Sequence, residues 1–161
     1  EGWHFLTLGR SLERVDMTAR LVSTAHVNSA TPGAWLNVLQ CCGAHHAFVR
    51  TYGGLTTDRD AAEFLLLDRA SPRSVVHNLE AAEAALADLE GADGRRAGVD
   101  DEARRLLGTA RSALEYRAPG RVLEDLSRRM GDLQRTCNRV SDAVTARYFS
   151  GAAVATWNGG S

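Results

Sequence analysis

The sequence contains neither lysine nor isoleucine, so all 19 basic residues are arginine. We interpret this bias as the codon usage of a GC-rich genome and not as a functional signal. The formal net charge of -1 leaves no basic excess. Because binding to nucleic acid or to an anionic membrane surface depends on such an excess, we expect neither as a partner. No apolar run approaches the roughly 20 residues of a membrane span.

Cysteine is also scarce, since the chain has three cysteines and two of them are adjacent. Such a set does not form the disulfide framework of a secreted domain, and we therefore expect the reducing cytoplasm. No signal peptide is visible, and the chain begins at Glu1 without a methionine. These features predict that the sequence is a piece of a longer protein.

A length of 161 residues, with 44% hydrophobic and 24% charged residues, predicts one globular domain with its own core. Nearly every segment has helical periodicity, and no segment alternates as a strand would. The predicted helices cover about 3–26, 31–52, 57–67, 71–90, 100–117 and 122–148. Their lengths and short links predict an all-α fold, an antiparallel bundle of about five to six helices over residues 1–150. Residues 151–161 are predicted to be a frayed tail.

Four of the predicted helices begin at a capping residue. Thr31-Pro32 and Ser71-Pro72 each place a capping hydroxyl before a proline at the first helical position. Thr57 and Asp100 are the predicted caps of two further helices.

The first predicted helix is apolar on two opposite sides. One stripe, at alternating spacings of three and four, consists of Phe5, Leu8, Leu12, Val15, Ala19 and Val22. At about 100° per residue, the opposite side carries Trp3, Leu6, Arg10, Glu13, Arg14, Met17 and Leu21. A surface helix normally keeps one side for water. We therefore expect these charges to lie at a packed contact, where they must be paired.

Arg10, Glu13 and Arg14 have three interpretations. The favoured one is a structural ion-pair network that ties this helix to a neighbour, with Arg10 and Glu13 one turn apart. The second is an anion or carboxylate site, because arginine forks bind phosphate or carboxylate and a glutamate can orient them. The third is a solvated helix face.

Two Cys/His pairs at a spacing of four residues lie on the predicted second helix. The candidate metal ligands are Cys41, Cys42, His45 and His46. This spacing can present two ligands to one metal ion, but a structural zinc site takes four and no second cluster is evident. An apolar stripe on the same helix contains Trp35, Leu39, Cys42, His46 and Val49. Core packing is therefore favoured over a metal site or a reactive thiol, and no cofactor is predicted.

The segment Asp68-Arg69-Ala70-Ser71-Pro72-Arg73-Ser74 joins two predicted helices. Its favoured interpretation is a capped turn. Arg73 conflicts with the preference of a first helical turn for acidic residues. Such a conflict can mark an anion site beside free backbone N–H groups, or a long-range ion pair with Asp68 or Glu13.

Motifs for known catalytic or nucleotide-binding sites are missing from the sequence. It has no Gly-x-Ser-x-Gly, no Walker loop and no Rossmann glycine pattern. Tyr116, near the end of the fifth predicted helix, is interpreted as a packing residue. No catalytic residue can be assigned from these patterns.

Four blocks of the sequence have a combined pattern that resembles a known family. They are Trp3 to Arg20 with Glu13-Arg14, Ala34-Trp35-Leu36, Glu63 to Ser74, and Leu114-Glu115-Tyr116 through Ala143, Tyr148 and Phe149. The third block is the most specific. Together they span about residues 2–150 and resemble the bacterial alpha-E domain family, an all-helical domain with a Glu-Arg motif.

The resemblance carries several expectations. Family members are about twice this length, and the present chain resembles their second half, so a missing N-terminal half is one expected partner. Members are typically encoded beside, or fused to, ATP-grasp-type amide ligases and transglutaminase-like peptidases. This association implies a role near peptide or amide-bond formation. The family transfers no catalytic residue, and the motif positions here are Arg10, Glu13, Arg14, Asp68, Pro72, Arg73 and Ser74.

Two functional hypotheses follow. The favoured one is a non-catalytic helical module that binds a partner ligase or peptidase, or presents a peptide to it. The alternative is a small-ligand site or an enzyme in which Arg10, Arg14 and Arg73 clamp a carboxylate or phosphate. Glu13 would act there as a base only if it is desolvated.

Overall fold

Seven α-helices make up the part of the chain that the computed structural model describes, residues 2–53, 56–92, 101–118 and 120–149. They are α1 (Gly2–Val27), α2 (Ala34–Cys41), α3 (His45–Tyr52), α4 (Asp58–Leu67), α5 (Val75–Ala92), α6 (Glu102–Glu115) and α7 (Leu126–Tyr148). No strand occurs within these residues, and the all-α bundle is confirmed. The count exceeds five to six because the predicted second helix is two helices, α2 and α3.

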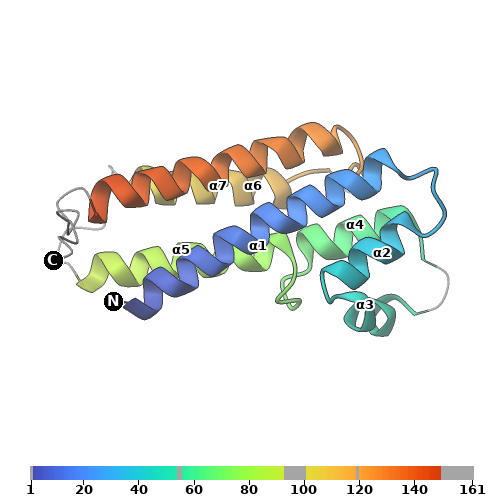
Figure 1. Ribbon diagram of the computed structural model, residues 1–161, viewed down its shortest axis with the longest axis horizontal. Helices are drawn as coiled ribbons and strands as arrows, with labels where there is room; N and C mark the ends of the chain where they lie inside the picture. The colour runs from blue at the N-terminus through green and yellow to red at the C-terminus, as the bar shows by residue number, and fades with distance from the viewer. Residues whose placement is uncertain (1, 54–55, 93–100, 119, 150–161) are drawn as a thin grey trace, which may run out of the picture.

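The four longest helices, α1, α5, α6 and α7, form an antiparallel bundle (Figure 1). α1 packs against α5 and α7, and α6 packs against the same two helices. Near the start of α1, His4 Nδ1 lies 3.3 Å from Asp88 Oδ2 on the last part of α5. Phe5 contacts Tyr148 at the end of α7, with ring centroids 5.2 Å apart. Both contacts show that α1 runs antiparallel to α5 and α7.

The three short helices lie at the end of the bundle where α1 ends (Figure 1). α2 packs against α1 and α4, and α3 packs against α2 and α4. Phe48 of α3 makes an edge-to-face contact with Phe64 of α4, with centroids 5.5 Å apart. Thr57 begins α4 with a capping box, in which its hydroxyl and the Asp60 carboxylate bond to each other's backbone N–H. The predicted cap at Thr57 is confirmed.

Two other predicted helix starts are wrong. Thr31-Pro32 lies in a turn, and α2 follows Gly33, which has a φ of 81° and no side-chain cap. At α5 the capping side chain is Ser74 instead of Ser71, because Ser74 Oγ accepts from the N–H of His77 at 3.2 Å. The predicted cap Asp100 and the predicted tail 151–161 lie outside the described residues.

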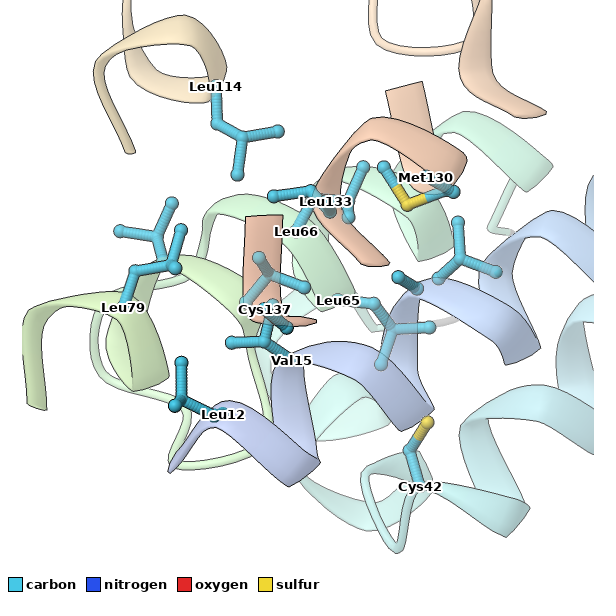
Figure 2. Packing of buried hydrophobic residues seen from close by; sticks show 14 of the residues in the cluster. Leu12, Val15, Cys42, Leu65, Leu66, Leu79, Leu114, Met130, Leu133 and Cys137 are labelled. Atoms are coloured by element: carbon cyan, nitrogen blue, oxygen red, sulfur yellow. The ribbon is translucent and has the colours of Figure 1, made fainter. Parts of the chain in front are cut away.

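The core is filled mainly by aliphatic side chains from all four long helices and α4 (Figure 2). On α1 the predicted inward stripe from Leu8 to Val22 is at most 7% exposed, and Phe5 is half-buried. On α7 the buried residues repeat at spacings of three and four: Leu126, Met130, Leu133, Cys137, Val140 and Val144. Each large aliphatic side chain contributes about 1.5–3 kcal/mol by leaving water. None of the described helices is long and apolar enough to cross a bilayer.

Candidate functional site

The outer face of α1 is exposed along the whole helix. We call the following residues the outward stripe: Trp3, Leu6, Arg10, Glu13, Met17, Arg20, Thr24 and Val27. Their spacing alternates between three and four residues, which is the heptad pattern of a helix–helix seam. Four of them are large and apolar, and each of these four has at least half of its surface exposed. α1 therefore has two heptad-spaced faces, one in the core and one open.

The charges of the outward stripe are not buried or paired as predicted. Arg10 and Glu13 are both exposed, and neither forms an ion pair with any residue that the structure describes. Arg20 pairs within its own helix, with Nε 2.8 Å from Asp16 Oδ2. The predicted Arg10–Glu13 network is therefore wrong, because this side of α1 is not covered by another helix of the bundle.

Arg14 differs from Arg10 and Glu13 because its side chain is half-buried against α5. Its Nη1 donates to the carbonyl oxygen of Pro72 at 3.4 Å. Arg10 and Arg14 line a shallow groove of about 270 Å³ between α1 and α5. The other lining residues are Trp3, Leu6, Thr7, Ser11, His77, Asn78 and Ala81. Within the described residues neither arginine has a carboxylate partner, so the groove carries positive charge.

The loop from Asp68 to Ser74 is closed by hydrogen bonds between its two ends. Asp68 Oδ1 accepts from the N–H groups of Ala70 and Ser71, at 2.8 and 2.9 Å. Ser74 Oγ donates to the carbonyl oxygen of Asp68 at 2.5 Å and caps α5. Ser74 is fully buried. Asp68 and Ser74 therefore hold the turn itself, in agreement with the capped-turn interpretation.

Asn78 is a residue of this region that the sequence interpretation missed. Its Nδ2 donates to the carbonyl oxygens of Pro72 and Ser74, at 3.2 and 2.7 Å. The carbonyl oxygen of Pro72 thus accepts from Asn78 on α5 and from Arg14 on α1. The sequence did contain a signal for this role, because Asn78 stands among the apolar residues Val75, Val76 and Leu79. A buried amide needs hydrogen-bond partners, so such a position predicts a structural hydrogen bond.

The two arginines of the loop have different roles. Arg69 reaches α6 and α5, with Nη2 2.5 Å from Glu115 Oε1 and Nη1 3.6 Å from Glu80 Oε1. Arg73 pairs with neither Asp68 nor Glu13, which were its predicted partners. Its guanidinium lies over Gly43, where a Cβ would be 3.7 Å from Nη2. Neither arginine therefore joins the Arg10 and Arg14 groove.

Gly43 separates the two cysteines from the two histidines of the Cys/His pairs. Its φ of 64° ends α2, so Cys41 and Cys42 precede the break while His45 and His46 begin α3. The apolar stripe is confirmed for Trp35, Leu39 and Cys42, which are buried, but His46 and Val49 are exposed because the break changes the helix phase. Within the described residues, no group of three or more His, Cys, Asp or Glu could hold a metal ion.

The buried thiol of Cys42 is a poor nucleophile. Burial raises its pKa to about 11, and the neighbouring Cys41 acts in the same direction. A hydrogen bond with Thr18 and the charge of Arg73 oppose this shift without cancelling it. Because the thiolate is the reactive form, the structure does not support the reactive-thiol interpretation at this position.

The outward stripe and the closed loop meet at the Glu-Arg dipeptide. A family model described as Alpha-E, a predicted alpha-helical domain with a conserved ER motif, matches residues 1–149. The chain belongs to the Alpha-E family. No curated protein and no solved structure matches it significantly. Glu13-Arg14 is the one Glu-Arg dipeptide in the sequence and is therefore the ER motif of this member.

In this Alpha-E domain the two motif residues face different surroundings. Arg14 is half-buried and contacts the Asp68–Ser74 loop through Pro72. Glu13 is exposed on the outward stripe. The motif therefore connects the hydrogen-bonded Asp68–Ser74 loop to the open face of α1.

Proposed function

We propose that this Alpha-E domain is a non-catalytic helical module that docks a partner protein along the outward stripe of α1. The heptad-spaced exposure of Trp3, Leu6, Met17 and Val27 carries this proposal. Large apolar residues that recur along one open helix face are typical of an interaction surface. A partner helix with apolar residues at matching positions would bury them.

The surroundings of the ER motif support a docking role over catalysis. Catalytic groups usually converge in a concave pocket, where burial and neighbours adjust their pKa values. Glu13 instead lies on a convex helix face in contact with solvent. Arg14 donates to a backbone carbonyl oxygen of the Asp68–Ser74 loop.

The proposed partner is an ATP-grasp-type amide ligase or a transglutaminase-like peptidase, in the cytoplasm. The support is the association of alpha-E proteins with these enzymes, which connects the domain with the formation or modification of peptide or amide bonds. The charges on the stripe specify the partner further, because Arg10 would face an acidic residue and Glu13 a basic one. The N-terminal half of a longer alpha-E protein is a second proposed occupant of the same face.

A small-ligand site is the second candidate function, and the groove between α1 and α5 favours it. Arg10 and Arg14 line this groove without carboxylate partners among the described residues. Two guanidinium groups at one groove can bind a carboxylate or phosphate bidentately. The groove is small, about 270 Å³, and Arg14 already donates to the carbonyl oxygen of Pro72, which makes this candidate the weaker of the two.

The test is capture of partners from the host lysate by the tagged full-length protein. We expect wild type to recover the ligase or the peptidase, identified by mass spectrometry, and the double variant Leu6→Glu, Met17→Glu to lose it. Val49→Glu is the matched control, because Val49 is an exposed apolar residue on α3. Circular dichroism checks that all three proteins are folded.

Equal recovery by the folded double variant would contradict docking on the outward stripe. If wild type recovers neither enzyme, the Arg10 and Arg14 groove becomes the better candidate. Amino acids and nucleotides would then be screened against wild type and Arg10→Ala.

A further inference from the structure

A second groove lies between α7 and α6, the one long helix that does not pack against α1 (Figure 1). Its volume is about 400 Å³. The apolar lining includes Leu106, Leu114 and Leu133, of which the last two are buried. On α6 the facing residues Thr109, Ala110 and Ala113 have short side chains, so they leave the space above these leucines unfilled.

Arg129 lines this groove and has an unusual environment for an arginine. Its side chain is half-buried, and its Nη1 donates to the carbonyl oxygen of Val122 at 2.9 Å. No carboxylate among the described residues forms an ion pair with it. Burial lowers the pKa of Arg129, and the nearby charge of Arg117 lowers it further. Charges removed from water are normally paired, so this guanidinium lacks the partner its position calls for.

The adjacent Arg128 shows the contrast. It is exposed, and its guanidinium lies 3.1 Å from Asp125 Oδ2 and 3.8 Å from Asp132 Oδ2. Asp132 is the one carboxylate that lines the groove, and it also bonds to Arg135. Asp132 is thus already shared by two other arginines, and Asp125, whose negative charge also acts on Arg129, is paired with Arg128.

The rim of the groove carries further positive charge at its other end. Arg105 forms no ion pair within the described residues, and Arg139 pairs with Glu102 at 3.0 Å. From Arg129 to Arg139 the ten-residue rise of α7 spans about 15 Å. The groove therefore has an apolar floor long enough for several residues of a peptide. An arginine without an ion pair among the described residues lies near each end, Arg129 at one and Arg105 at the other.

We propose that this groove binds a short acidic and apolar peptide segment of another protein. A carboxylate of the segment pairs with Arg129, and an adjacent apolar side chain packs on Leu114 and Leu133. Charge complementarity selects this occupant, because Arg105 and Arg129 form no ion pair within the described residues. The leucine floor favours a peptide with apolar side chains over a bare phosphate or nucleotide. The site is separate from the outward stripe and does not rest on the docking function proposed for it.

The experiment is a selection from a random dodecapeptide library displayed on phage, with the immobilised wild-type protein as bait. We expect the enriched peptides to carry Asp or Glu next to large apolar residues. Their affinities are then measured by fluorescence anisotropy for wild type, Arg129→Gln, Ala113→Glu and Arg128→Gln. Ala113 is exposed, so a glutamate there fills the groove and occupies Arg129 without disturbing the core.

We expect affinity to fall by about tenfold or more in Arg129→Gln and Ala113→Glu, since each removes a charge-assisted contact. Arg128→Gln should change it by less than about twofold, because Arg128 is already paired and exposed. If Arg129→Gln unfolds, Ala113→Glu still decides the question. The proposal is overturned if no peptide is enriched, or if the enriched peptides bind all four proteins equally. It is also overturned if they lose affinity equally in Arg128→Gln.

Discussion

Cys42 and Cys137 show at the residue scale how burial changes the chemistry of a side chain. Both are buried, and burial raises their pKa values to about 11 and about 12. Cys41, one residue before Cys42, is exposed. The three thiols have the same chemistry in the unfolded chain and differ only through the fold, so their titration reports on folding.

We expect the free energy of unfolding to fall as the pH rises from about 9 towards 11 and 12. The unfolded thiols, with an ordinary pKa of 9.0, lose their protons first, while the folded ones keep theirs. Urea midpoints at about pH 8 and pH 10 would measure this loss. It should shrink in Cys42→Ala and Cys137→Ala and stay unchanged in Cys41→Ser. The same pH-dependent loss in all three variants would contradict the assigned pKa values.

Tyr116 shows why residue roles near helix ends are hard to predict. It was interpreted as a packing residue, but it is 87% exposed. α6 ends at Glu115, so Tyr116 lies just outside the helix. The helical periodicity that predicted a buried position for Tyr116 therefore does not apply to it. Periodicity predicts a side only for residues inside an element, and helix boundaries are the least certain part of such a prediction.

α1 shows at the element scale what periodicity does predict. The stripe from Leu8 to Val22 is buried as expected, and Arg10, Glu13 and Met17 share the opposite side as expected. The favoured interpretation placed these charges at a packed contact, whereas their exposure corresponds to the third interpretation, a solvated face. Residue spacing gives the phase of a helix, but what covers each face depends on how other helices pack.

Gly43 is the reason that the predicted single helix over 31–52 was wrong. A glycine inside a periodic pattern can be an interior residue or a C-terminal cap, and spacing does not separate the two. Here its left-handed backbone ends α2, and the guanidinium of Arg73 lies over it. That contact comes from 30 residues further along the chain and follows only from the tertiary structure.

The turn from Asp68 to Ser74 leads to a stability prediction. Ser74→Ala removes the cap of α5 and the hydrogen bond to the Asp68 carbonyl oxygen. We expect a loss of about 1–2 kcal/mol in the free energy of unfolding, the cost of a removed N-cap. Urea denaturation would measure it, with Ser112→Ala at an exposed position of α6 as the control. Equal stability of Ser74→Ala and wild type would show that these bonds do not hold the turn.

At the scale of the whole molecule, ion pairs connect the loop with two bundle helices. Arg69 of the loop and Arg111 of α6 both bind Glu115, and Arg111 also reaches Glu83 of α5 at 3.1 Å. Glu115 and Glu83 are 12% and 20% exposed, so water screens these pairs less than it screens pairs on the open surface. These pairs connect the loop, α5 and α6 to one another.

The two methionines of the chain lie in opposite environments, one in the core and one on the open face of α1. Met130 of α7 is fully buried at the centre, whereas Met17 of α1 is 52% exposed on the outward stripe. We expect Met130→Ala to cost about 2–5 kcal/mol of unfolding free energy, because it leaves a cavity. Met17→Ala should stay within about 0.5 kcal/mol of wild type and still weaken partner capture.

Thermal and urea unfolding of Met130→Ala and Met17→Ala measure the effect on stability, and capture from lysate measures the effect on partner binding. A large loss of stability in Met17→Ala would mean that the outward stripe is already packed in the isolated protein, for example against a second copy of the chain. Unfolding that depends on protein concentration would identify that case, since association stabilises the folded state by mass action. A stable Met17→Ala variant with weakened capture would instead assign the stripe to a partner, and the ER motif would then place Glu13 at that interface and Arg14 beneath it.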